Sequence, residues 1–197
     1  MKMRTLLVLS LMLIMAGCIP TLTLQPVWDK QHVVSEPAFE GRWISEEGDS
    51  ILRVSSQAKD GEYLLDFASE DGVTHYEGHL IRLAGHLILD LSLEKDAGDK
   101  LVSGQAFAPV LPAHFFARIR IEGDKLYIGL LADEEMEKQI DAGAVKVQWS
   151  KISDGILLTG STAELQEAVA KLSGDDKIWD ESTFYRASSL LAPDGGK

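Results

Sequence analysis

Cysteine is nearly absent from this chain, which limits how its fold can be stabilised. Cys18 is the single cysteine among 197 residues, so no disulfide can form within the chain. Stability must therefore come from a hydrophobic core. The length is sufficient for one ordinary domain with such a core, without covalent cross-links.

Basic side chains are also scarce. The chain has 19 Lys and Arg against 31 Asp and Glu, which gives a net charge of −12. Two of the basic residues, Lys2 and Arg4, lie at the extreme N-terminus, and without them 17 basic side chains face 31 acidic ones, a net charge of −14. Phosphate backbones and anionic lipid head groups repel such a body. Nucleic acid is therefore not an expected partner.

The N-terminus lacks a hydrophobic run long enough to cross a membrane. The apolar run extends from Leu6 to Met15, which is too short for a helix that spans a bilayer core of about 30 Å. Lys2 and Arg4 precede it, and the small residues Ala16 and Gly17 follow it. A charged start, a short apolar core and a small-residue processing site are typical of a secretory signal peptide. We predict that residues 1–17 form one.

The stretch Met15-Ala16-Gly17-Cys18 resembles the lipobox of bacterial lipoproteins. The resemblance implies cleavage before Cys18 and acylation of that cysteine, so that lipid holds the protein at the membrane. Acyl chains contribute about 0.8 kcal/mol per buried methylene, and several chains give stable anchoring. Ile19 follows, where an Asp would favour the inner membrane in Gram-negative lipoproteins. We therefore expect an exported protein at the outer membrane, facing the periplasm.

The segment after the cysteine lacks a sustained period. Residues 18–38 include Pro20, Pro26 and Pro37, which predicts a semi-extended lipidated tether. Trp28 within it is expected to dock back on the domain or to rest at the lipid interface. The main domain is predicted to span residues 39–187, and residues 188–197 are predicted to form a flexible tail.

From residue 41 onwards, apolar and polar residues alternate in short segments. Asp-Gly or Gly-Asp pairs at Asp60, Asp71 and Gly123 separate several of them, a pattern typical of antiparallel hairpins. Eight or nine strands are predicted, including a last one at 183–187. Such a mainly β meander closes most simply into a small barrel of about eight strands, which removes the edge strands. A two-sheet β-sandwich is the alternative.

Two short helices are predicted near the C-terminus. The first begins at Asp133 and ends at Gly143. The second follows the sequence Ser161-Thr162-Ala163-Glu164, which is typical of a capping box, and ends at Gly174. Ser161 is therefore interpreted as a helix N-cap rather than as a nucleophile, because the Gly-x-Ser-x-Gly motif of serine hydrolases is absent.

Gly41-Arg42-Trp43, at the start of the first predicted strand, resembles the Gly-x-Trp motif of lipocalins. The resemblance implies an eight-stranded barrel with Trp43 at its closed end and an arginine lying across the tryptophan, a place that Arg186 can take. The chain also resembles a loosely defined set of bacterial lipoproteins, and this second likeness implies no function.

His75, Glu77 and His79 fall on one face of a predicted strand, since strand side chains repeat every two residues. Two histidines and a glutamate match the ligands of a catalytic zinc ion. The favoured interpretation is an ordinary solvent-facing surface, because Tyr76 and Leu80 form the better core-facing set, so no metal and no cofactor are predicted.

Charged residues also interrupt other predicted strands. Asp66 and Asp90 could serve glycoside hydrolysis if they converged in a cleft. The preferred interpretation is an outer barrel surface on which they pair across strands with Arg118 and Arg120.

Residues 94–113 form a predicted loop that is too long for a hairpin connection. Its second half is apolar, and Pro109 and Pro112 keep it out of a central strand. Long apolar loops either cover the core or contact partners. The residues that we predict to contact a ligand or partner are Trp43, Phe107, Val110 and Leu111.

Three functions follow from these features, in order of preference. The first is a non-enzymatic, lipid-anchored barrel that binds an apolar ligand or lipid. The second is an envelope protein-interaction module with a solid core, and the third is a minor hydrolase activity. The contents of the barrel distinguish the first two, because eight strands can either fill with side chains or hold one small ligand.

Overall fold

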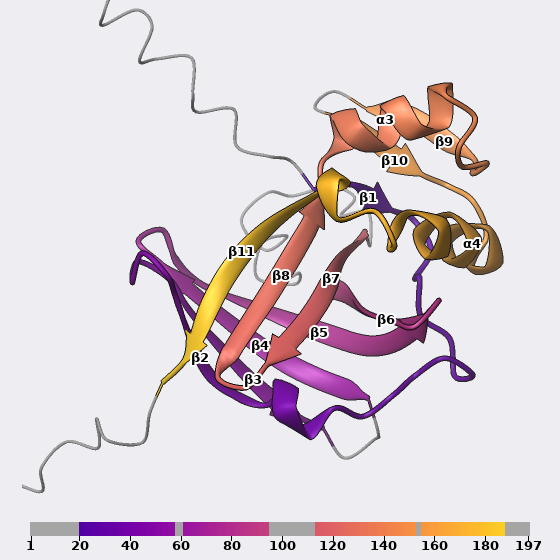
Figure 1. The fold of residues 1–197 in the computed structure, drawn as a ribbon. Helices are drawn as coiled ribbons and strands as arrows, with labels where there is room; N and C mark the ends of the chain where they lie inside the picture. The colour runs from indigo at the N-terminus through magenta and orange to yellow at the C-terminus, as the bar shows by residue number, and fades with distance from the viewer. Residues whose placement is uncertain (1–19, 58–60, 95–112, 153–154, 188–197) are drawn as a thin grey trace, which may run out of the picture.

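A computed structural model describes residues 20–57, 61–94, 113–152 and 155–187, and it is mainly β (Figure 1). Eight antiparallel strands close into a barrel, as predicted, and the sandwich alternative is wrong. These strands are β2 (Gly41–Ser45), β3 (Ile51–Ser56), β4 (Glu62–Ser69), β5 (Gly72–Leu83), β6 (His86–Leu93), β7 (His114–Glu122), β8 (Lys125–Leu131) and β11 (Trp179–Arg186).

The barrel is a meander whose last strand returns to its first. Strands β2 to β8 pair in chain order, and β11 inserts between β8 and β2. The pairing of β6 with β7 bridges the long chain segment between them. Because every barrel strand has two neighbours, the barrel leaves none of the unpaired edges that promote aggregation.

Three short strands extend this barrel at one end. β1 (Leu22–Thr23) pairs with the start of β7 and runs parallel to β10 (Gly155–Leu158), which pairs in turn with β9 (Trp149–Ile152). The sequence had predicted further barrel strands around 145–158. Only 149–152 and 155–158 form strands there, and they lie outside the barrel because β11 pairs with the remaining edge of β8 and closes on β2.

The segment predicted as a tether packs against the domain from Pro20 onwards. Thr21, Thr23 and Val27 are all buried. Further along, the amide of Val34 donates to the Leu80 carbonyl at 2.9 Å, and a 3-10 helix, η1 (Pro37–Phe39), leads into β2. The domain therefore begins near residue 20 rather than at 39. We call residues 20–36 the strap.

Both predicted helices are present. α3 (Asp133–Asp141) begins at the predicted residue, and Gly143 beyond its end has a positive φ of 69°. α4 (Thr162–Leu172) begins with the predicted capping box, in which Ser161 accepts from the Glu164 amide and Glu164 accepts from the Ser161 amide. It is the longest helix among the described residues, as expected. A second 3-10 helix, η2 (Asp176–Ile178), leads into β11.

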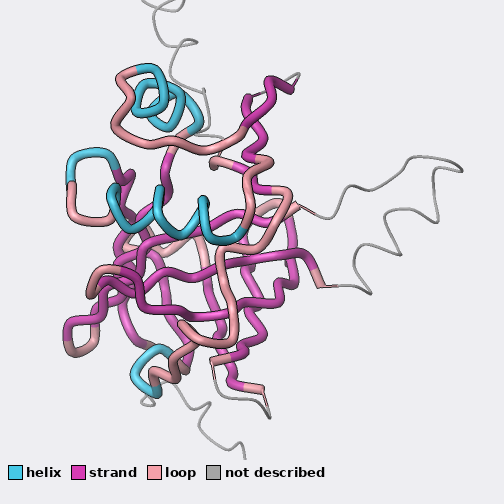
Figure 2. Tube along the Cα trace, turned by 90° about the vertical axis from the view of Figure 1, so that its right-hand side faces the viewer, coloured by secondary structure: helices cyan, strands magenta, loops and turns pink. Residues whose placement is uncertain are grey.

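Two hydrophobic cores lie on opposite sides of the barrel wall. The inner one fills the barrel and contains Trp43, Tyr63 and Leu80. The outer one lies between the wall and the layer formed by the strap and α4, and contains Val27, Ile88 and Leu165. The helices consequently lie outside the strands, as Figure 2 shows. Strand β6 is buried on both faces from Ile88 to Leu91 because it separates the two cores.

One end of the barrel is closed by Trp43 and Arg186, the two residues that the lipocalin resemblance pairs. Trp43 is fully buried, and its indole nitrogen donates to the Phe39 carbonyl at 2.9 Å. The Arg186 guanidinium carbon lies 4.1 Å from the centroid of the Trp43 ring. We call this the closed end, and the opposite end, where the strap begins, the mouth.

Candidate functional site

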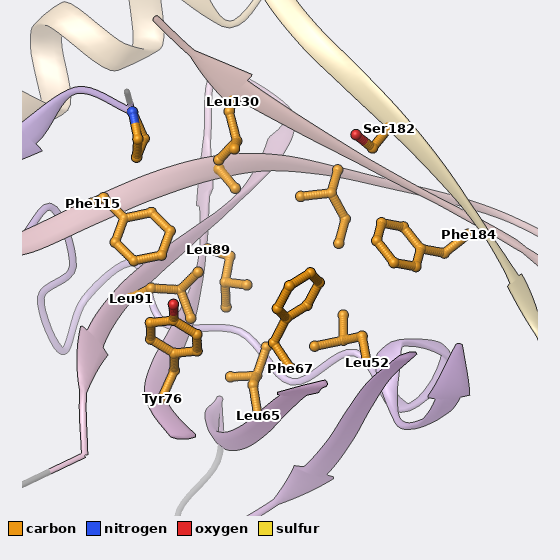
Figure 3. A pocket seen from close by; sticks show the side chains of 13 residues that line it. Leu52, Leu65, Phe67, Tyr76, Leu89, Leu91, Phe115, Leu130, Ser182 and Phe184 are labelled. Atoms are coloured by element: carbon orange, nitrogen blue, oxygen red, sulfur yellow. The ribbon is translucent and has the colours of Figure 1, made fainter. Parts of the chain in front are cut away.

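The half of the barrel towards the mouth contains an apolar cavity of about 300 Å³ (Figure 3). Side chains from seven barrel strands and the start of the strap surround it. They are Pro20, Leu52, Leu65, Phe67, Tyr76, Leu89, Leu91, Phe115, Ala117, Ile128, Leu130, Ser182 and Phe184. The volume lies at the lower end of the range for small-molecule sites, so the cavity suits a slender apolar ligand.

The lining is buried at the bottom of the cavity and partly exposed towards the mouth. Leu65, Leu89 and Ala117 lie at the bottom, each at most 2% exposed. Phe67 and Phe115 are half-buried. Figure 3 shows the side chains of opposite walls pointing towards one another across the space. The exposure gradient gives the cavity a blind bottom and an opening.

Small residues and alternation explain why this half of the barrel is hollow. Along β4, Tyr63 fills the closed end, while Leu65 and Phe67, two and four residues further, line the cavity. Ala117 and Ser182, on other strands of the lining, supply little volume. The side chains of opposite walls therefore leave a gap between them in this half of the barrel.

Two polar side chains reach the cavity. Ser182 is exposed and belongs to β11. Burial raises the pKa of Tyr76 above its ordinary value of 10, so its phenol stays uncharged at neutral pH. A neutral hydroxyl near the opening can hydrogen-bond a polar head group, while the rest of the lining offers hydrophobic contact alone.

The predicted contact residues divide into two groups. Trp43 lies at the closed end and is not among the residues that line the cavity, so its visible role is to close the barrel. Phe107, Val110 and Leu111 lie outside the described residues, and so does Cys18.

The histidine pattern on β5 does not assemble into a site. His75 points its Nδ1 at the Asp66 carboxylate at 2.7 Å. His79 instead stacks on Trp28, with ring centroids 3.7 Å apart and planes at 4°. No group of three potential metal ligands that could hold an ion occurs in the part of the chain that the structure describes.

A polar cluster on the outer wall was not predicted from the sequence. Asp90, 1% exposed, accepts from the Val27 amide at 2.6 Å through one oxygen and pairs with His114 Nδ1 at 2.7 Å through the other. His79 faces Asp90 across the β5–β6 ladder. The contacts that the structure gives these groups go to one another and to the strap. Their arrangement therefore fastens the strap to the wall.

The predicted cross-strand pairs between aspartates and arginines are wrong. Arg118 bonds the Ser173 carbonyl and Asp176, and Arg120 binds Glu181 at 2.8 Å. The residues do point outward from the barrel, but the strap covers Asp90, and residues from η2 and β11 reach the arginines first. Asp66 and Asp90 face histidines instead, so the two carboxylates do not form a hydrolytic pair.

No family model, curated protein or solved structure matches the chain. Among the described residues, none of the helices is both long enough and apolar enough to cross a bilayer.

Proposed function

We propose that the protein is a lipid-anchored protein of the bacterial envelope whose barrel binds an apolar ligand. The observation that carries the proposal is the cavity of about 300 Å³, closed at the Trp43 end and lined by apolar side chains. A barrel that served as a solid interaction module would have no need for an underfilled half. The cavity therefore favours ligand binding over that alternative.

The lining also defines the chemistry of the ligand. None of the residues that line the cavity is charged, and the phenol of Tyr76 is neutral. A charged group at the bottom would be left without a partner, at a large cost in free energy. The expected ligand is a hydrocarbon chain or similarly apolar group, with any polar group placed at the mouth.

Native mass spectrometry of the full-length protein, purified in mild detergent, tests this proposal. We expect the wild-type protein to carry a non-covalently bound apolar molecule. Ala117→Phe places a ring in the bottom of the cavity and should abolish the adduct. Ala68→Phe makes the same change on the outward face of β4, because Ala68 alternates with the inward Phe67, and should retain the adduct.

Circular dichroism must show that both variants are folded. An adduct that survives Ala117→Phe unchanged in a folded protein would contradict binding in the cavity, and so would the lack of an adduct on the unmodified protein.

The anchoring part of the proposal rests on the lipobox resemblance at Cys18 and needs its own experiment. Cells are grown with labelled palmitate, and the unmodified protein is compared with Cys18→Ala. Label should be incorporated into the protein with the natural Cys18 and should be absent from the Cys18→Ala variant. Label that still entered the variant would contradict lipidation at this cysteine.

A further inference from the structure

The chain enters the domain at the rim of the cavity, and this fixes where any anchor must lie. Pro20 is itself a lining residue and forms a bridge with Ala132. Next to it, the amide and the hydroxyl of Thr21 both donate to the Leu131 carbonyl at 3.0 Å, and Thr21 is 1% exposed. The first described residues are therefore fastened to the end of β8, beside the mouth.

The distance from this point to the lipidated residue is short. A single residue, Ile19, separates Cys18 from Pro20, so the two Cα atoms are at most about 7 Å apart. The strap cannot supply extra length, because it is fixed along the wall by Val27 and by the stacked Trp28. An acylated Cys18 would consequently hold the mouth close to the bilayer surface.

The two ends of the barrel differ in a way that suits this orientation. Near the mouth, Leu93 is 40% exposed and lies opposite Tyr76 in the β5–β6 ladder. Phe67 and Phe115, beside them, are partly exposed. At the closed end, Arg186 and Asp124 are paired and lie near the surface. These apolar groups, which lie between acidic turns at residues 46–49 and 70–71, are the part of the mouth best suited to contact lipid.

We propose that the mouth faces the membrane that holds the Cys18 lipid, and that the cavity takes up one acyl chain of a lipid directly from that membrane. This inference rests on the proposed function, and it adds the source of the ligand and its route. The acyl chain of the lipid then passes from the bilayer into the cavity, from one apolar environment to another. Direct transfer avoids the cost of exposing a hydrocarbon chain to water, about 0.8 kcal/mol per methylene.

Depth-dependent quenching tests the orientation. Ser182→Cys places a thiol at the cavity, and Asp124→Cys places one at the closed end, where the Asp124 side chain is 87% exposed. Each lipidated variant is labelled with bimane and reconstituted into phosphatidylcholine vesicles that carry doxyl-labelled acyl chains. We expect quenching of the label at 182 to exceed that at 124 severalfold. Equal quenching would overturn the orientation.

A spacer makes the test sharper. Ten Gly/Ser residues inserted after Ile19 lengthen the link by a root-mean-square distance of roughly 18 Å and leave the barrel intact. Quenching at 182 should then fall towards the value at 124. The same spacer added after Lys197 is the control and should change nothing. Quenching at 182 that is insensitive to the first spacer would contradict an anchor-imposed orientation.

The source of the acyl chain is tested with deuterated phosphatidylcholine vesicles and native mass spectrometry. A non-covalent adduct of the deuterated mass supports uptake from the membrane. A protein that carries only its covalent acyl groups, in a cavity closed to added lipid, would overturn it. If the quenching result fails while an apolar adduct remains on detergent-purified protein, the proposed function stands and this inference alone is wrong.

Discussion

Arg186 closes the barrel by lying across Trp43 while it bonds the chain just before β2. Its guanidinium nitrogens donate to the carbonyls of Glu40 at 2.8 Å and Ala38 at 2.7 Å. The glycine of the Gly-x-Trp motif has a physical reason here. A Cβ on Gly41 would approach Arg186 Nη1 to 2.7 Å, and its φ of 132° is unfavourable for other residues.

Arg186→Lys should therefore destabilise the domain although the charge is kept. A lysine ammonium cannot stack on the ring and bond both carbonyls in this planar geometry. We expect the free energy of unfolding to fall by about 2 kcal/mol, measured by urea denaturation. Arg42→Lys, at an exposed position on β2, is the matched control and should be neutral. Equal losses in both variants would contradict the stacking interpretation.

The stack of His79 on Trp28 predicts a loss of stability in mild acid. Burial lowers the pKa of His79 below 6.5, although Glu62, Asp90 and Glu77 raise it and His114 lowers it further. Below 6.5 the unfolded chain binds a proton that the folded protein resists, so the free energy of unfolding falls as pH decreases. His79→Phe keeps an aromatic ring but cannot titrate. Its melting temperature should drop less than that of the unmodified protein between about pH 8 and pH 5, and identical drops would contradict the prediction.

Asp133 predicts the opposite dependence on pH. It is 8% exposed, its Oδ1 has no hydrogen-bond partner among the described residues, and burial raises its pKa above 3.8. Ionisation above that ordinary value therefore costs stability in the folded protein. Asp133→Asn keeps an acceptor for the Ile156 amide and should stabilise the domain by about 1 kcal/mol at neutral pH. The gain should vanish near pH 3.

Glu134→Gln is the control for that experiment, because it removes the same charge from the first turn of α3 at an exposed position. It should show no gain at neutral pH, since an acidic residue at a helix N-terminus is mildly favourable. A gain as large as that of Asp133→Asn would contradict an origin in burial.

Two glycines should respond differently to alanine because of what surrounds them. At Gly78 a Cβ meets the Leu65 Cδ1 atom at 2.7 Å, and that side chain can move into the cavity. At Gly61 a Cβ meets Val33 at 2.2 Å and the Val34 carbonyl oxygen at 2.8 Å, with a φ of 73°.

We expect Gly78→Ala to change the free energy of unfolding by less than about 1 kcal/mol and to weaken ligand binding by narrowing the cavity. Gly61→Ala should cost about 3 kcal/mol through backbone strain and displacement of the strap. Chemical denaturation compares the two, and similar costs would show that Leu65 has no room to move.

The features predicted correctly from the sequence depend on short-range patterns. The hairpins follow from period-two alternation and turn glycines, and the start of α4 follows from the Ser161–Glu164 capping box. The closure of the barrel could also be predicted from the sequence, because a meander of this many strands has few other ways to pair its edges. The place of Arg186 across Trp43 came from a family resemblance rather than from local physics.

The course of the strap and the residues that line the cavity could not be predicted, because both depend on long-range packing. Pro20, Pro26 and Pro37 favour an extended chain, but nothing near them specifies that Val27 finds Asp90 or that Trp28 finds His79. The cavity lining cannot be predicted from the sequence for a related reason. Inward positions read as apolar whether their side chains meet or leave a gap, and the difference depends on volumes contributed by several strands at once. An unusually buried aspartate such as Asp90 offers no distinguishing pattern in the sequence.

The strap and the residues that follow it are tied to the last helix and the last strand, which has a consequence for the order of folding. Thr162 and Gln166 of α4 donate to the carbonyls of Pro26 and Val27, and Arg186 donates to those of Ala38 and Glu40. These contacts span nearly the whole domain, and contacts so distant in sequence slow folding. The N-terminal residues cannot reach their final positions before the last strand has been synthesised. Under the export that we propose for this protein, this delay would keep the chain unfolded, and therefore translocatable, until its synthesis is almost complete.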